Sequence, residues 1–365
     1  MNTTCLLSEL IEVYCVALQR EKPADEGTQK RYRGALDIML QLLGDREING
    51  YSKQDLVVLK AKLYRWPANV HKSEEFSGKT AEEILRIKTA KTLDKRTVDS
   101  KYMEKISAVF KYAYNHGLIA MDIAENVVKS VTVAEKKANR RKSYDIEDLK
   151  KIFAALPVHP DRPHLAWIPL IAAYCGARHG EICSLRVSDI NLCQRIPYLL
   201  LTEEDDNGSV VTNIRGEVSR RMVPLHHVLM KMGLPQYVAM RKAEEKELLF
   251  ELRKKGEDEF VPLTGEYYGQ SFERYNRKHV TNDLRKSFYS FRFTLHKALQ
   301  LKNVPPELCF AITGHVPQFD NQKAGREDRL LADRHTALEQ LEYPGLDLTG
   351  LKARLDTLLT AKKRL

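Results

Sequence analysis

Apolar residues recur at helical spacing along most of this chain, and strand-like alternation is confined to one short stretch. In the first part of the chain the helical pattern covers four segments, with Ser52 placed to cap the third and Gly117 placed to end the fourth. These segments are residues 5–21, 28–43, 53–64 and 97–116. Residues 65–80 are rich in Pro, Asn, Ser and Gly, and predict a loop. We therefore expect an all-helical first domain, residues 1–133.

The strand-like stretch lies in the second part of the chain. Residues 196–201 and 209–214 alternate or run apolar on either side of an Asn-Gly pair, which is typical of tight hairpin turns. Residues 220–225 predict a further strand, and the rest is helical in pattern apart from a polar loop expected over residues 256–272. The fold class that follows is mainly α with a small antiparallel β-sheet in a second domain, residues 144–365.

Residues 134–143 join these two parts and carry a run of positive charge. Five of the eight residues from Glu135 to Lys142 are cations: Lys136, Lys137, Arg140, Arg141 and Lys142. Such a run is usually a solvated linker, but between two domains it can also follow a phosphate backbone. The whole chain has a formal charge of +10, which favours a nucleic acid as partner. A basic protein without a polyanionic partner is the alternative.

The cysteines and the apolar runs indicate in which cellular compartment the protein is expected. The 6 cysteines include no Cys-x-x-Cys pair and mostly lie among apolar residues, so they predict buried thiols rather than zinc ligands or disulfides. No stretch approaches the ~20 apolar residues of a membrane-spanning helix, and the N-terminus lacks a signal-peptide pattern. We expect a cytoplasmic protein without membrane contact, metal or cofactor.

Residues 285–315 contain the first candidate for a functional site. The pattern predicts a helix that begins near Arg292, followed by an apolar run that returns Gly314 and His315 to the same neighbourhood. An arginine beside the free N–H groups of a helix start, together with a histidine, can hold a phosphodiester. A surface arginine and a capping histidine are the alternative.

Residues 164–186 contain the second candidate. A helix in this stretch breaks at Cys175-Gly176, and the glycine permits a tight turn that places Arg178 at the start of the next helix. Glu181 follows three residues later on the same face, where it can orient that arginine through a charge-assisted hydrogen bond.

Four motifs and a tail follow one another along the chain: Ala173-Tyr174-Cys175-Gly176-Ala177-Arg178-His179-Gly180-Glu181, Arg220-Arg221-Met222-Val223-Pro224-Leu225, Ser290-Phe291-Arg292, Thr313-Gly314-His315 and Tyr343-Pro344-Gly345. In this order and spacing they resemble the tyrosine recombinase (phage integrase) family over nearly the whole chain. The resemblance implies a helical core-binding domain that contacts DNA over residues 1–133. It also implies a basic linker over 134–143 and a tyrosine-recombinase-like catalytic domain over 144–365.

Members of that family cleave one DNA strand with a tyrosine and rejoin it to another strand without metal or ATP. Their catalysis combines oxyanion stabilisation with general acid–base chemistry around a covalent intermediate. The resemblance implies that Arg178 and Arg292 clamp the scissile phosphate and that Glu181 supports Arg178. It further implies that His315 assists proton transfer and transition-state binding.

Several positions depart from the family pattern. Tyr289 replaces a catalytic histidine, and a phenol with a pKa of about 10 donates a hydrogen bond but does not exchange protons at neutral pH. The lysine expected on the hairpin is absent, and Arg215, which keeps the charge there, is a poor proton donor. Residues 316–342 contain no Tyr, Ser or Cys that could act as nucleophile. The resemblance assigns the one downstream tyrosine, Tyr343, to a structural tail.

Three interpretations follow from these residues. The first is a DNA-binding protein that has lost strand cleavage and acts as an accessory, regulatory or structural factor on a mobile element. Its phosphate contacts would come from the linker cations and from Arg178, Arg292, His315, Arg220 and Arg221. The second is an active recombinase that uses Tyr343 or a nucleophile supplied in trans. The third is a protein-interaction module that keeps the fold without binding DNA, which the net charge disfavours.

The first interpretation also predicts partners and location. Double-stranded DNA is the expected ligand, with no small-molecule substrate, and the protein is expected on the nucleoid of a prokaryote. Self-association or pairing with an active integrase on DNA is expected as well. Residues from 351 onward carry an amphipathic helical pattern that could pack either on the same chain or on a neighbouring subunit.

Overall fold

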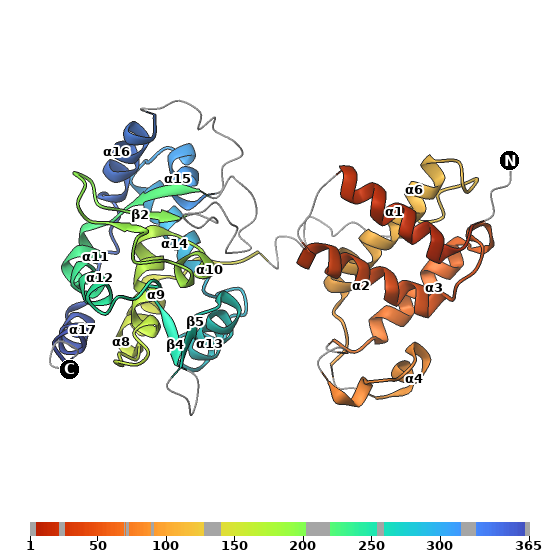
Figure 1. Ribbon diagram of the computed structural model, residues 1–365, viewed down its shortest axis with the longest axis horizontal. Coiled ribbons are helices and arrows are strands. Elements are labelled where there is room, and N and C mark those ends of the chain that lie inside the picture. The colour runs from red at the N-terminus through yellow and green to blue at the C-terminus, as the bar shows by residue number, and fades with distance from the viewer. Residues whose placement is uncertain are drawn as a thin grey trace. The chain divides into compact units, whose positions relative to one another are not determined.

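The computed structural model describes residues 5–21, 26–68, 70, 73–88, 91–127, 140–201, 220–253, 259–314 and 326–361. The chain divides into two compact units, Met1–Ala138 and Asn139–Leu365, and each unit has its own hydrophobic core. Figure 1 shows that helices dominate both units. In the described part of the chain no helix is long and apolar enough to cross a membrane.

The secondary-structure elements in the described residues of the first unit are all helices. Its elements are α1 (Leu7–Glu21), α2 (Glu26–Leu43), η1 (Ile48–Gly50), α3 (Lys53–Arg65), η3 (Glu74–Phe76), α4 (Ala81–Arg86), α5 (Lys95–Thr97), η4 (Val98–Met103) and α6 (Glu104–Asn115). Ser52 caps α3 as predicted, because its hydroxyl accepts a hydrogen bond from the Asp55 backbone N–H. The helix expected over 97–116 begins with a π-helical stretch, η4, which turns Asp99 inward to pair with Lys60.

The second unit is built around a central buried helix, α9 (His164–Cys175), in which every residue except Leu165 is buried. The other helices are α8 (Ile146–Ala155), α10 (His179–Cys183), α11 (His227–Met232), α12 (Leu234–Ala243), α13 (Gly265–His279), α14 (Ser290–Leu301), α15 (Pro306–Thr313), α16 (Arg326–Leu338) and α17 (Thr349–Ala361). A helix that is apolar all round must be covered on every side. The neighbouring helices α10, α11 and α14 supply part of this cover.

The second unit also contains a small antiparallel sheet in the order β1 (Ile190–Asn191), β2 (Tyr198–Leu201) and β3 (Arg221–Pro224). In its register Leu199 lies opposite Val223, and both side chains are fully buried. The strands expected at 196–201 and 220–225 are therefore confirmed, whereas the strand expected at 209–214 lies outside the described residues. The predicted fold class, mainly α with a small antiparallel sheet, is confirmed.

The polar loop expected over residues 256–272 is wrong for most of that stretch. A two-stranded hairpin, β4 (Glu251–Arg253) with β5 (Phe260–Pro262), is followed at Gly265 by α13. The Thr264 hydroxyl caps this helix by accepting a hydrogen bond from the Tyr267 N–H. The side chains of Tyr268 and Phe272, one helical turn apart, are both buried. Polar residues on the outer face obscured this apolar pair in the sequence.

The C-terminal helix α17 packs on its own chain, against α8 and α12 (Figure 1). Its apolar face, which includes Leu351, Leu355 and Leu358, is buried in the core of the second unit. Arg354 donates hydrogen bonds to the carbonyl oxygens of Leu156, at 2.7 Å, and Phe153, at 3.0 Å, and so caps the C-terminal end of α8. Of the two arrangements expected for this segment, the structure shows the intramolecular one.

Candidate functional site

The site begins at the C-terminal end of α9, where Gly176 turns the chain toward Arg178. Gly176 has a φ of 64°, and a Cβ at this position would lie 2.9 Å from Cγ2 of Thr313. Only glycine satisfies both the left-handed backbone and the close approach of α15. The turn places Arg178 at the N-cap of α10, as the sequence predicts.

Glu181 is the buried anion of the site, with 2% of its surface exposed. It accepts hydrogen bonds from the Arg178 backbone N–H and from Arg178 Nη1, both at 2.7 Å. It also accepts from Arg221 Nη1 at 3.1 Å and Nη2 at 2.9 Å. Burial alone would raise the pKa of this carboxyl, but the Arg221 charge and hydrogen bond, with those of Arg178, lower it to about 2.

Arg221, which was expected to contact DNA, has a buried side chain. The side chain, carried by β3, is 3% exposed, and its Nε donates to the carbonyl oxygen of Ile312 at 3.0 Å. A Cβ at Gly314 would lie 2.7 Å from Arg221 Nη1, so the α15 C-terminus closes directly over this side chain. Arg221 therefore fixes the position of Glu181 and acts on the site through that carboxylate.

Arg292 lies near the start of α14 and is 2% exposed. Its Nη1 donates to the carbonyl oxygen of Gly176 at 2.9 Å, which is one of the carbonyl groups left without a helical partner where α9 ends. Burial, together with the charges of Arg178 and Arg221, lowers the pKa of Arg292 to about 10. Among the described residues, two guanidinium groups thus bond to the Glu181 carboxylate and a third, that of Arg292, lies near enough to be affected by their charges, so the cluster has an excess of positive charge.

Tyr289, at the position of the expected histidine, packs beside Arg292. The Arg292 guanidinium carbon lies 5.8 Å from the centroid of the Tyr289 ring, and the Arg141 guanidinium carbon lies 5.7 Å from it. Both distances are within the range of cation–π attraction. The ring therefore contacts both an arginine of the basic segment and an arginine of α14.

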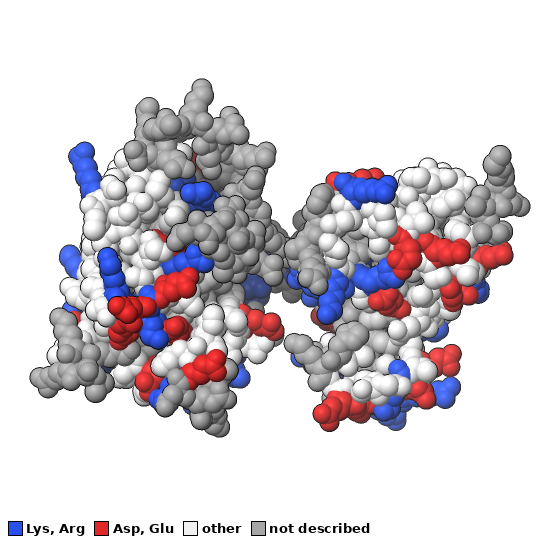
Figure 2. All heavy atoms as spheres, viewed as in Figure 1, with Lys and Arg blue, Asp and Glu red and all other residues white. Residues whose placement is uncertain are grey.

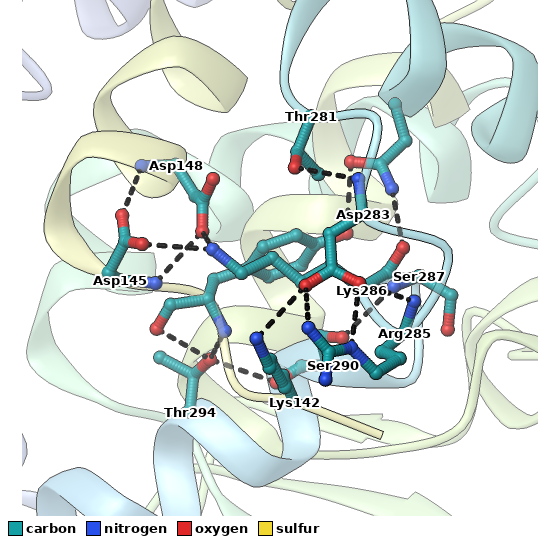
Figure 3. Close-up of polar contacts among 12 residues, drawn as sticks. Lys142, Asp145, Asp148, Thr281, Asp283, Arg285, Lys286, Ser287, Ser290 and Thr294 are labelled. Atoms are coloured by element: carbon teal, nitrogen blue, oxygen red, sulfur yellow. Dashed lines mark hydrogen bonds and ion pairs between the residues drawn. The ribbon is translucent and has the colours of Figure 1, made fainter. Parts of the chain in front are cut away.

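The cations of the basic segment differ in their surroundings. Arg140 and Arg141 are exposed, and Arg141 Nη1 donates a hydrogen bond to the Ser287 hydroxyl. Lys142 is paired with Asp283 at 3.1 Å, as Figure 3 shows. Lys136 and Lys137 lie outside the described residues.

Two further positions proposed from the sequence, Arg215 and His315, also lie outside the described residues. Arg220 is exposed, next to the buried Arg221. On the face shown in Figure 2, basic and acidic side chains are interspersed over both units. The positive charge of the described residues is therefore not gathered into one patch on that face.

Tyr343 is engaged in packing. Its hydroxyl donates a hydrogen bond of 2.6 Å to the carbonyl oxygen of Ala173, in the last turn of α9. Its ring meets that of Tyr174 edge to face at 5.5 Å, and burial raises the pKa of its hydroxyl well above 10. These contacts fit the structural tail that the resemblance implies.

Three side chains outside this cluster have the residue types of a metal site: His226, His227 and Glu339. His227 Nδ1 contacts Glu339 at 2.7 Å. Both nitrogens of His226 are engaged, Nδ1 by the Val228 N–H and Nε2 by the Leu341 carbonyl oxygen. A metal would have to break these hydrogen bonds, so the group is better explained as packing between α11 and the end of α16.

Solved structures of integrases share this architecture. A lambda integrase tetramer bound to a Holliday junction matches with a TM-score of 0.55 and 15% identity, over 88% of this chain and 81% of that chain. The Tn1549 transposon integrase in complex with transposon right end DNA matches with a TM-score of 0.54 and 16% identity, over 91% and 100%. A lambda integrase dimer bound to a COC′ core site matches with a TM-score of 0.52 and 15% identity, over 94% and 98%.

The chain has the integrase fold. At the level of sequence, no protein-family model and no curated protein matches it.

Within this integrase fold, sequence reasoning missed the roles of two arginines. Arg221 was expected as a DNA contact, and its burial depends on its hydrogen bonds to Glu181 in α10 and to Ile312 in α15. Arg141 was expected only as one of the linker cations, and its place beside Tyr289 depends on how residues 140–148 pack. The adjacent arginines at 220 and 221 were a usable signal, because two neighbours on a strand face opposite sides.

Proposed function

We propose that this chain is a DNA-binding member of the tyrosine recombinase family that grips a backbone phosphate without cutting it. The observation that carries the proposal is the cluster in which Arg178 and Arg221 bond to one carboxylate, Glu181, and a third arginine, Arg292, lies within reach of their charges. An anion bound beside these guanidinium groups would offset their mutual repulsion. Phosphate diesters suit this role because guanidinium groups donate paired hydrogen bonds to their oxygens.

The solved integrases to which the chain is similar are bound to DNA, which supports a DNA backbone as the source of that phosphate. The formal charge of +10 also favours binding to DNA, because cations that neutralise DNA phosphates release the counterions bound to them. Within the proposed site Arg178 contacts the phosphate, since 37% of its side chain is exposed. Glu181 holds Arg178 in place, and Arg221 in turn holds Glu181.

The absence of cutting is supported by the residues that would perform the chemistry. The hydroxyl of Tyr343 is bonded to a helix carbonyl, and residues 316–342 offer no tyrosine, serine or cysteine. A phenol at Tyr289 replaces the expected histidine. Because such groups act as a unit, the loss of the nucleophile alone removes nearly all cleavage.

A second candidate is an active recombinase. This candidate is favoured by the ion pair between Arg178 and Glu181 and by the presence of Arg292 in the buried site. Its nucleophile would be Tyr343, released from Ala173, or a residue supplied in trans. The two candidates differ in one observable, which is whether DNA becomes covalently attached to protein.

In the preferred role the protein is an accessory, regulatory or structural factor on a mobile element, located on cytoplasmic DNA. It acts beside a second copy of itself or an active integrase. The lambda integrase in the solved complexes is a dimer or a tetramer, which supports assembly on DNA.

The experiment that tests the proposal is a salt titration of binding to a duplex of about 30 base pairs. The expected affinity falls steeply with salt, with a logarithmic slope of about −0.9 for each phosphate contact. Arg178→Ala should weaken binding about tenfold and reduce that slope by about one. Lys352→Ala, on the outer face of α17, is the matched control and should leave both unchanged. Retention that does not depend on salt would contradict DNA binding.

A further inference from the structure

Two groups of charged side chains fasten residues 142–148 to the loop that precedes α14 (Figure 3). In the first, Lys286 Nζ contacts Asp145 at 2.9 Å and also pairs with Asp148. In the second, Asp283 accepts from Arg285 at 2.9 Å and from Lys142 at 3.1 Å. Lys286 and Asp148 are largely buried, so the first group is protected from screening by salt.

Backbone hydrogen bonds reinforce the same attachment. The Lys142 N–H donates to the Arg285 carbonyl oxygen at 3.0 Å, and the Tyr144 N–H donates to the Thr294 hydroxyl at 2.8 Å. The Thr294 hydroxyl in turn donates to the Ser290 carbonyl oxygen within α14. The chain just after Arg141 is therefore fixed to the first turns of the helix that carries Arg292.

This attachment sets the position of Arg141. Its guanidinium reaches Ser287 and lies 5.7 Å from the Tyr289 ring centroid, while Arg292 lies 5.8 Å from the same centroid. Both guanidinium groups are thus within the range of cation–π attraction to one aromatic ring. A phosphate bound by the exposed Arg141 would therefore lie at the start of the helix that carries Arg292.

We propose that Arg141 is a phosphate ligand of the Arg178–Arg292 site, delivered to it by the charged attachment of residues 142–148 and oriented by the Tyr289 ring. This inference rests on the proposed function and adds a residue to the same site. Arg141 is exposed and able to reach DNA, whereas Arg292 is buried. Its proximity to α10 is also visible in His179, whose pKa is lowered chiefly by burial and further by the Arg141 charge.

A double-mutant cycle tests the assignment. The singles Arg141→Ala and Arg178→Ala and their double are measured by salt-controlled binding to a duplex of about 30 base pairs. Each single should weaken binding about tenfold. If the two arginines share one phosphate, the double should weaken it by about ten- to thirtyfold rather than a hundredfold. The matched control is Arg140→Ala, the exposed neighbour, whose effect should simply multiply with that of Arg178→Ala.

Tyr289 provides a second readout. Tyr289→Phe keeps the ring and should preserve the coupling between Arg141 and Arg178, whereas Tyr289→Leu should abolish it. Independent, multiplicative effects of Arg141→Ala and Arg178→Ala, equal to those seen with Arg140→Ala, would overturn the assignment. A wild-type protein that shows no salt-dependent retention would instead overturn the proposed function itself. Arg141 is exposed, so thermal unfolding of Arg141→Ala should match wild type and exclude misfolding.

Discussion

Replacing Glu181 with glutamine tests the energetics of the arginine cluster. The substitution keeps the shape of the side chain and removes the charge that faces Arg221, whose side chain is 3% exposed. Breaking a buried ion pair by removing one partner costs about 3–5 kcal/mol, because the other charge stays buried without compensation. For a domain of this size class each kcal/mol lowers Tm by about 2–4 °C, so we expect a fall of about 6–20 °C.

The pH dependence of unfolding reports on the same ion pairs. The pKa of Glu181 is lowered from 4.5 to about 2, so its contribution is fully present above pH 4.5 and is lost as pH falls toward 2. Such a shift corresponds to about 3 kcal/mol, in agreement with the cost of the broken pair. The difference in unfolding free energy between wild type and Glu181→Gln should therefore shrink over this interval.

Denaturant unfolding followed by circular dichroism, at a series of pH values, measures this difference. The matched control is Glu147→Gln, which removes a surface ion pair with Lys150 and should change stability by less than about 1 kcal/mol. Added inorganic phosphate should raise the Tm of Glu181→Gln more than that of wild type, because it replaces the missing negative charge. A Tm of Glu181→Gln within about 2 °C of wild type would refute the reasoning.

Three further substitutions probe the packing around the site. Tyr343→Phe should cost about 1–2 kcal/mol by leaving the Ala173 carbonyl without its hydrogen bond; unchanged duplex affinity in a binding assay would support a structural role, and a loss of affinity would contradict it. Gly314→Ala should cost about 1–3 kcal/mol in denaturant unfolding, because its φ is 68° and the new methyl group would meet Arg221; wild-type stability would show that α15 does not close over that arginine. Leu355→Ala should cost about 2–5 kcal/mol in the same assay, and no loss would mean that α17 does not pack on its own chain.

The helical framework could be predicted from the sequence because its signals are local. Ser52 caps α3 through Asp55, three residues away, and Glu181 bonds to Arg178 at the same spacing. Hydrophobic periodicity likewise predicts α17, whose leucines face inward. Each of these features depends on residues within one or two turns of a helix.

The parts that could not be predicted depend on contacts between distant segments. The burial of Arg221 requires Ile312, 91 residues further along the chain, and the position of Arg141 requires Ser287, 146 residues away. The start of α13 was missed for a different reason, since its apolar residues Tyr268 and Phe272 are few and the rest of the segment is polar. Single-sequence patterns carry no information on which segments meet.

A strand-cleavage assay tests most directly whether the protein binds a backbone phosphate without cleaving the DNA. Duplexes that bind the protein are selected from a random library, nicked at each position and incubated with it, and the mixtures are separated on denaturing and native gels. We predict complexes on the native gel and no protein–DNA adduct on the denaturing gel, for wild type and Tyr343→Phe alike. An adduct that survives denaturation would contradict this account, and its loss in Tyr343→Phe would identify the nucleophile.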